Sequence, residues 1–257
     1  MSLDSQPADR ISIGRIVRDA YAGLKARFVD ITALAALLLL PPWVLVGFAN
    51  DPETAMFWQI LANIPILVFD GAAIWVMHRA LTGAPTAPAS DALRLSLARL
   101  SQLFSIFALS SAPVWLSLGV LGLIGQTALL AASPLVLAGV LALNLLLIFA
   151  QPLVMLEGLP AFPAMALSAR LTKGRRWPLL AVVLIMATLS GLNYAVSFGA
   201  PPLIGMVAPK DLAERITAFV AQPLMIFALE PLAAALVTAT YLELRRSAGS
   251  PSMQPVR

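Results

Sequence analysis

The stretch 57–77 reads FWQILANIPILVFDGAAIWVM and holds a single charged residue, Asp70. A helix rises about 1.5 Å per residue, so about 20 apolar residues cross the roughly 30 Å of hydrocarbon in a bilayer. The chain contains five further stretches of this kind, at 29–48, 103–124, 129–156, 177–198 and 216–244. The sequence therefore predicts an all-α polytopic membrane protein with six transmembrane helices.

The composition favours the same class of protein. Hydrophobic residues make up 60% of the 257 positions and charged residues only 12%, whereas soluble domains are about half apolar and a quarter charged. The chain has no cysteine and one histidine, His78, so we expect no disulfide, no histidine-based metal site and no catalytic triad. We predict no cofactor and no enzymatic activity.

The positions of the basic residues predict an orientation. Of the 17 Lys and Arg residues, 15 lie before the first predicted span, in the second and fourth connections, or after the sixth span, and the other two are Lys210 and Arg215 in the fifth connection. Positive charge concentrates on the cytoplasmic side of membrane proteins. We therefore predict a bacterial inner (cytoplasmic) membrane protein with both termini in the cytoplasm. Because the basic residues flank spans and form no single patch, we expect no nucleic-acid partner.

Three amphipathic segments, 11–28, 91–102 and 163–173, precede the outward spans. Each combines an apolar face with basic residues, which is typical of helices that lie on a membrane surface. We predict three cytoplasmic surface helices. Anionic lipid headgroups are the partners that such side chains attract, and the candidate contacts are Arg15, Arg18, Lys25, Arg170, Lys173, Arg175, Arg176 and Trp177.

This order makes three copies of one unit, which is a surface segment, an outward span and an inward span. The inward spans share an amide, a proline and a later acid, as in Gln151-Pro152 before Glu157 and Gln222-Pro223 before Glu230. The pattern suggests a threefold internal repeat of a two-span unit, and chance similarity is the alternative. We expect one transmembrane domain over 11–246, with disordered ends at 1–10 and 247–257.

Polar residues inside the predicted spans are the candidates for a functional site: Asp70, Glu230, Gln151 and Gln222. An acid within a membrane span costs about 2.5–3.5 kcal/mol on insertion scales, which invites a functional explanation. The alternative is a structural role, with Asp70 protonated or paired, Glu230 on a helix kinked at Pro231, and the amides bonded between helices. We expect Glu157 to lie at a membrane edge, paired with a basic residue.

Sequence motifs at three places resemble one bacterial family. Glu157-Gly158-Leu159 is followed by SARLTKGRRW at 168–177, the opening segment 13–20 reads IGRIVRDA, and the closing segment 241–245 reads YLELR. Together they resemble the YciC-like six-span membrane proteins and the membrane domain attached to some glycerophosphodiester phosphodiesterases. The resemblance implies a bacterial inner-membrane protein. It does not imply a phosphodiesterase, because that catalytic domain would need several metal-binding acids and histidines and this chain has one histidine. The family has no settled activity to carry over.

Two functions are therefore predicted. The first is a non-enzymatic membrane protein that organises lipid or acts as a scaffold for an envelope protein, with a membrane-protein partner or a second copy of the chain as its neighbour. The alternative is a secondary transporter or channel that uses Asp70 and Glu230.

Overall fold

The computed structural model describes residues 11–48, 52–124, 126–207 and 209–247, and in these ranges the chain is all-helical. This confirms the all-α part of the predicted fold class. The helices are α1 Ile13–Ala26, α2 Phe28–Gly47, α3 Pro52–Thr82, α4 Ala89–Ala98, α5 Leu100–Ile124, α6 Gln126–Leu147, α7 Ala150–Glu157, α8 Ala161–Leu171, α9 Arg176–Ile204, α10 Lys210–Ile216, the π-helix η1 Thr217–Ala221 and α11 Gln222–Ser247. The expected disordered end 1–10, and all of the expected tail after Ser247, lie outside these ranges.

Four helical segments of the described chain are long and apolar enough to cross a membrane: Ile60–Thr82, Ala138–Glu157, Arg176–Asn193 and Leu212–Ser247. The number rises to five if α4 and the first half of α5, which meet at 65°, count as one bent span. The first predicted span is represented by a shorter apolar helix, Phe28–Pro42. The structure thus supports a membrane protein with four or five spanning helices, and the sixth span stays a prediction.

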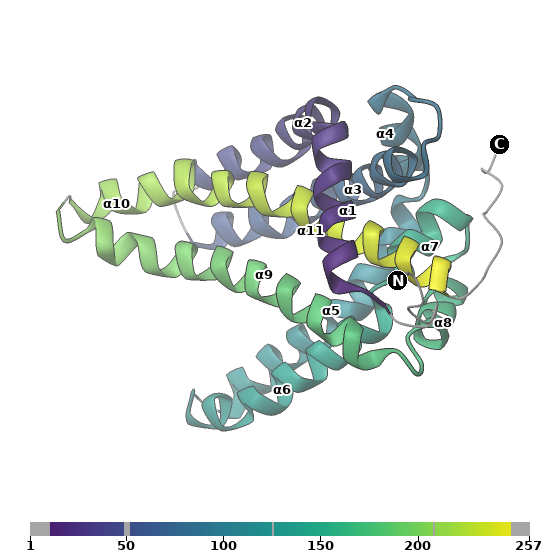
Figure 1. Cartoon of the computed structure of the whole chain (residues 1–257). Helices are drawn as coiled ribbons and strands as arrows, with labels where there is room; N and C mark the ends of the chain where they lie inside the picture. The colour runs from purple at the N-terminus through teal and green to yellow at the C-terminus, as the bar shows by residue number, and fades with distance from the viewer. Residues whose placement is uncertain (1–10, 49–51, 125, 208, 248–257) are drawn as a thin grey trace, which may run out of the picture.

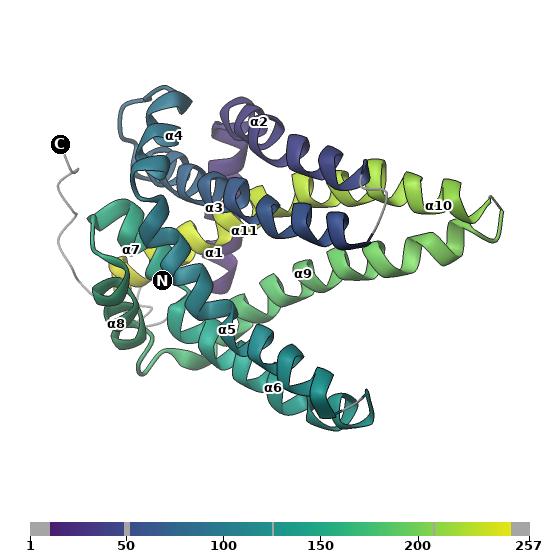
Figure 2. The same ribbon diagram turned by 180° about the vertical axis from the view of Figure 1, so that it is seen from behind.

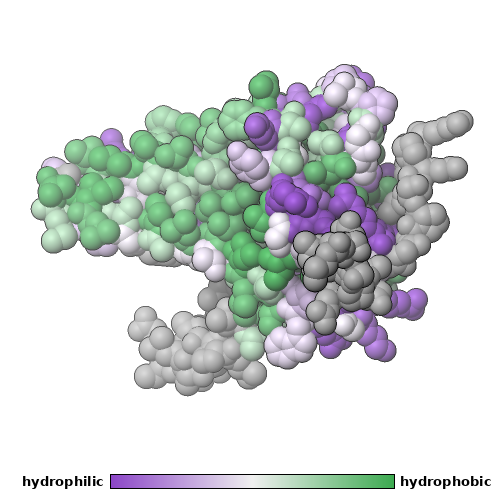
Figure 3. Space-filling model, viewed as in Figure 1, coloured by the Kyte–Doolittle hydropathy of each residue, from purple (hydrophilic) through white to green (hydrophobic). Residues whose placement is uncertain are grey.

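The helices form two arms that diverge from a common base (Figures 1 and 2). The larger arm holds α2, α3, α9, α10 and α11, and the α5–α6 hairpin forms the other. The base consists of α1, α4, α7 and α8 with the C-terminal ends of α3 and α11. Figure 3 shows hydrophobic side chains covering the larger arm and hydrophilic ones gathered at the base, which is the distribution expected if the arm lies in lipid.

The three predicted surface segments are helices of the base, and each packs on a helix that runs toward the base. α1 packs on α11, α4 on α3 and α8 on α7. Small residues at helix contacts allow close approach of the helix axes. At a further contact, between α1 and α3, a Cβ added to Gly23 would lie 2.6 Å from Met77 Cε. The buried residues of the surface helices include Ala20, Gly23, Ala92, Ser96, Ala164 and Ser168.

The α1 helix buries only the middle of its apolar face. Ile16 and Ala20 are buried against the protein, each only 1% exposed. Ile13 and Val17 lie beside them on the same side of the helix but are exposed, and Arg18 is exposed on another side. The helix therefore offers one side to the protein and has both apolar and basic side chains exposed, as expected for a helix that lies between lipid and water at a membrane surface.

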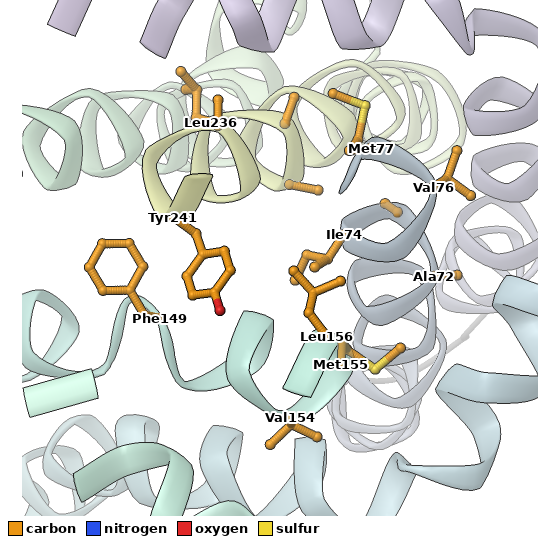
Figure 4. Close-up of a cluster of buried hydrophobic side chains, with 14 of the residues drawn as sticks. Ala72, Ile74, Val76, Met77, Phe149, Val154, Met155, Leu156, Leu236 and Tyr241 are labelled. Atoms are coloured by element: carbon orange, nitrogen blue, oxygen red, sulfur yellow. The ribbon is translucent and has the colours of Figure 1, made fainter. Parts of the chain in front are cut away.

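The hydrophobic core joins α3, α7 and α11 at the base (Figure 4). Phe149 and Tyr241 pack with their ring centroids 6.0 Å apart, a favourable spacing for aromatic pairs. Met155 of α7 and Ile74 of α3 belong to the same buried cluster. The core thus holds together three helices that are far apart in the sequence, and it fixes the depth at which their polar residues lie.

Candidate functional site

Asp70 lies on α3, beside a closely packed contact with α4. The neighbouring residue Gly71 has no side chain, which lets the Ser96 hydroxyl approach and donate a 2.8 Å hydrogen bond to the Val68 carbonyl. Phe69 is completely buried, whereas Asp70 is half-buried. The packing of α4 on this side holds α3 in register and sets the depth of the carboxyl group within the larger arm.

Glu230 is the second acid of the site, and it lies on α11, which packs against α3. The carboxyl groups of Asp70 and Glu230 are close enough for their charges to interact. The two positions lie 160 residues apart in the sequence, so no local pattern could predict this interaction. Within the described residues, no Lys or Arg forms an ion pair with either carboxylate.

Two carboxyl groups in a site of low dielectric constant repel each other when both are ionised. A bound proton or a cation between them removes that repulsion. No group of three or more His, Cys, Asp and Glu residues gathers as a metal site within the described part of the chain. Intramembrane acids are candidates for ion pathways and proton relays.

The two predicted amides lie at the starts of two helices. Gln222 is the first residue of α11, eight residues before Glu230, which is about 12 Å along a helix. Gln151 lies in the first turn of α7, a helix that packs against α3. Their membership of one polar site with the two acids stays a prediction.

The helix that carries Glu230 is irregular on its outer side. The backbone N–H of Gln222 donates to the Thr217 carbonyl, which closes the π-helix η1, and Pro223 and Pro231 follow. Proline lacks the N–H that a helix needs, so it leaves a carbonyl without its usual donor. Single π-turns are frequent at functional sites. The irregularity gives the outer part of α11 a point at which it can bend.

A set of ion pairs lies at the base, below the carboxyl pair. The Tyr241 hydroxyl and the Arg245 guanidinium both donate to Glu157 Oε1. This confirms the expectation that Glu157 pairs with a basic residue. It also joins two of the sequence motifs, since Glu157 belongs to the EGL segment at 157–159 and the other two residues to the YLELR segment at 241–245.

Glu243 is a second acid of the base, and its side chain is only 3% exposed. Arg15 Nη1 donates to Glu243 Oε2 over 3.4 Å, and the Ser12 backbone N–H donates to Oε1 over 3.3 Å. Arg246 lies 4.0 Å from the same carboxylate and 2.9 Å from Asp19. The C-terminal turn of α11 is thereby fastened to α1, so the IGRIVRDA segment also joins the YLELR segment.

Arg175 also serves the end of α11. Its guanidinium donates to the Leu244 carbonyl over 3.3 Å and to Ser247 Oγ over 2.8 Å. Arginine suits this place because the last carbonyls of a helix lack donors and carry partial negative charge. Arg15 and Arg175 thus direct their guanidinium groups to the protein. The other predicted headgroup contacts are exposed: Arg18, Lys25, Arg170, Lys173, Arg176 and Trp177.

Sequence reasoning did not predict the role of Glu243 or Tyr241 in this base. The signal available was the closing segment 241–245, in which a tyrosine, an acid and an arginine alternate with leucine.

Comparison with protein-family models, curated proteins and solved structures finds no match. The resemblance to the YciC-like family therefore stays a prediction.

Proposed function

We propose that this chain is a six-span bacterial inner-membrane protein, a secondary transporter or channel, in which Asp70 and Glu230 bind a proton or a small monovalent cation. The observation that carries the proposal is the packing of α3 against α11, which brings two acids of the predicted spans within reach of each other's charge. Acids within membrane spans are costly, and they mark ion pathways and proton relays more often than packing sites. A pair of acids without a described basic partner fits that role better than a single acid does.

The surrounding helices support the same proposal. Transporter sites lie near the middle of the bilayer on interrupted helices, and α11 combines the π-helix η1 with Pro223 and Pro231 around Glu230. The ion pairs of Glu157 and Glu243 hold the base end of α11. Motion would then be confined to the outer part of α11, above the carboxyl pair.

Cation binding can be tested on the purified protein in detergent. A ligand that binds only the folded protein raises its stability in proportion to RT ln(1 + [L]/Kd). We expect Na⁺, Li⁺ or a lower pH to raise the unfolding temperature of the wild-type protein, and the Asp70→Asn and Glu230→Gln variants to lose this dependence. Asp91→Asn, which alters an exposed acid of α4, is the matched control and should keep the wild-type response.

A second function has its own observation. Three basic residues are exposed here: Arg170 on α8, Lys173 in the connection after it and Arg176 at the start of α9. Trp177 beside them is 83% exposed. Basic residues next to an interfacial tryptophan attract anionic headgroups. This surface favours a non-enzymatic protein that organises lipid or forms a scaffold with a membrane-protein partner or a second copy.

The lipid proposal is tested by reconstitution into vesicles with and without an anionic lipid. Neutralising the three basic residues together should reduce the enrichment of anionic lipid that copurifies with the protein, while the Asp70→Asn variant should leave it unchanged. Equal amounts of anionic lipid with the wild-type protein and the triple variant would contradict this function.

The threefold repeat is also proposed rather than established. Its support is the order of packing, in which the surface helix of each unit contacts the inward helix of the unit before it, and α1 closes the cycle on α11. The YciC-like resemblance rests on the three sequence motifs alone, and these motifs lie together at the base.

A further inference from the structure

An open groove of about 260 Å³ lies between α2 and α3 in the larger arm. All nine side chains that line it are Leu, Pro, Ala or Trp. Its walls include Pro41 and Pro42 from α2, with Trp58, Ala62 and Pro65 from α3. The groove is separate from the carboxyl pair, because that pair lies between α3 and α11.

Three prolines on two facing helices explain why the hollow exists. A proline inside a helix bends it, and its compact ring fills less space than a leucine side chain. Ala62, which is 1% exposed, is a second small residue in the wall. The packing of α2 on α3 is otherwise close, so the groove is a local departure from it rather than a general looseness of the hairpin.

The direction and length of the groove match one hydrocarbon chain. From Leu37 to Leu45 the α2 wall covers eight residues, which is about 12 Å along a helix. Half of a bilayer's hydrocarbon thickness is about 15 Å. The groove runs along two antiparallel helices of the larger arm, which is the direction in which lipid chains lie. Its volume is close to the lower limit of about 300 Å³ for ligand pockets.

The surface around the groove narrows the choice of occupant. Leu45, Phe57 and Ile60 are large apolar residues at 44%, 55% and 49% exposure on the same hairpin. No charged residue lines the groove, so it offers nothing that would hold an ion or a headgroup. We infer that the α2–α3 groove binds one acyl chain of a membrane lipid in the leaflet far from the base, as a defined site distinct from general lipid contact.

Trp58 lines the groove and reports on its contents. The other four tryptophans, at 43, 75, 115 and 177, are replaced by Phe to leave Trp58 alone. The matched control replaces all five and carries Ile60→Trp, which puts the only tryptophan two residues along the same helix at an exposed position outside the groove. Both proteins are reconstituted in phosphatidylglycerol vesicles with an increasing fraction of lipid brominated at mid-chain.

Bromine quenches tryptophan fluorescence on contact. The curve of quenching against the fraction of brominated lipid therefore measures how often a lipid acyl chain lies beside each tryptophan. For the Trp58 protein we expect half of the quenching at about a threefold lower fraction of brominated lipid than for the Ile60→Trp control, because a defined site has a higher affinity than general contact. Coincident curves would overturn the inference, since they would mean general lipid contact only. Absence of quenching at Trp58 would also overturn it, since the groove would then be closed to lipid.

Two variants test whether the groove itself is responsible. Leu45→Phe narrows the groove at its exposed rim, and Ala62→Phe fills it from the wall. Each should move the Trp58 curve onto that of the control, while the Ile60→Trp curve in the same variant stays unchanged and reports that the hairpin is folded. An unchanged Trp58 curve in the folded Leu45→Phe protein would contradict the inference, even if Ala62→Phe does not fold.

Discussion

Arg15 of α1 and Glu243 of α11 form an ion pair between the two ends of the chain, with Nη1 3.4 Å from Oε2. The carboxylate is almost fully buried, whereas the side chain of Arg15 is 45% exposed. The ion pair therefore stabilises the buried negative charge of Glu243, while part of the Arg15 side chain stays exposed at the surface of the protein.

Glu243→Gln should destabilise the protein through loss of this contact. Breaking a buried pair costs more than breaking an exposed one, but the arginine left behind can be hydrated, so we expect a loss of about 1–2 kcal/mol. The measurement is the free energy of unfolding in mixed detergent micelles. Arg18→Gln, at an exposed position on α1, is the control and should change the free energy of unfolding little. An equal loss in both variants would contradict the role of Glu243.

Tyr241→Phe should separate the hydrogen bond of Tyr241 from its packing. The variant keeps the ring beside Phe149 and removes the hydroxyl that donates to Glu157. A hydrogen bond to a charged group contributes about 1.5–3 kcal/mol, so the free energy of unfolding should fall by a similar amount. Tyr241→Leu, which also removes the aromatic ring, should cost more. If the two variants were equally stable, the ring contact would contribute nothing.

Gly71→Ala should weaken the packing of α4 on α3. The added Cβ would collide with Ser96 Oγ and lie 2.9 Å from Leu103 Cδ1, so helix α4 would have to move and the bond from Ser96 to Val68 would weaken. Overpacking of this kind costs about 1–3 kcal/mol. Gly191→Ala is the control, because nothing lies within 4 Å of its added Cβ, and it should be neutral or stabilising by up to about 1 kcal/mol. Thermal unfolding of both variants in detergent distinguishes the outcomes.

The sequence was sufficient to predict elements but not their partners. Hydrophobic length and amphipathic period predicted the long helices and the surface helices α1, α4 and α8, because both signals are local. The charge interaction of Asp70 with Glu230 depends on how α3 and α11 pack, and no local pattern contains that information. Arg15 on a surface helix and Arg175 just before α9 illustrate the same limit, since a basic residue near the membrane surface has one sequence signature whether it contacts lipid or the end of α11.

The proposed topology predicts which residues are reached from the same side of the membrane. The natural chain has no cysteine, so single cysteines can be introduced without a background. Thr86→Cys and Gly174→Cys lie in loops of the base, and Met206→Cys lies at the far end of α9. In intact cells, an impermeant maleimide should label only Met206→Cys, and the other two should react after lysis. Labelling of all three in intact cells would contradict the six-span arrangement.

Ion flux in proteoliposomes is the most direct measurement of the proposed role of Asp70 and Glu230. With an imposed membrane potential, the wild-type protein should carry protons or an alkali cation above the rate of empty vesicles. Asp70→Asn and Glu230→Gln should each lower that rate at least about tenfold, with no further loss in the double variant because the two act as one site. Asp91→Asn should carry ions at the wild-type rate. Wild-type flux equal to that of empty vesicles, or full flux in the double variant, would contradict the account.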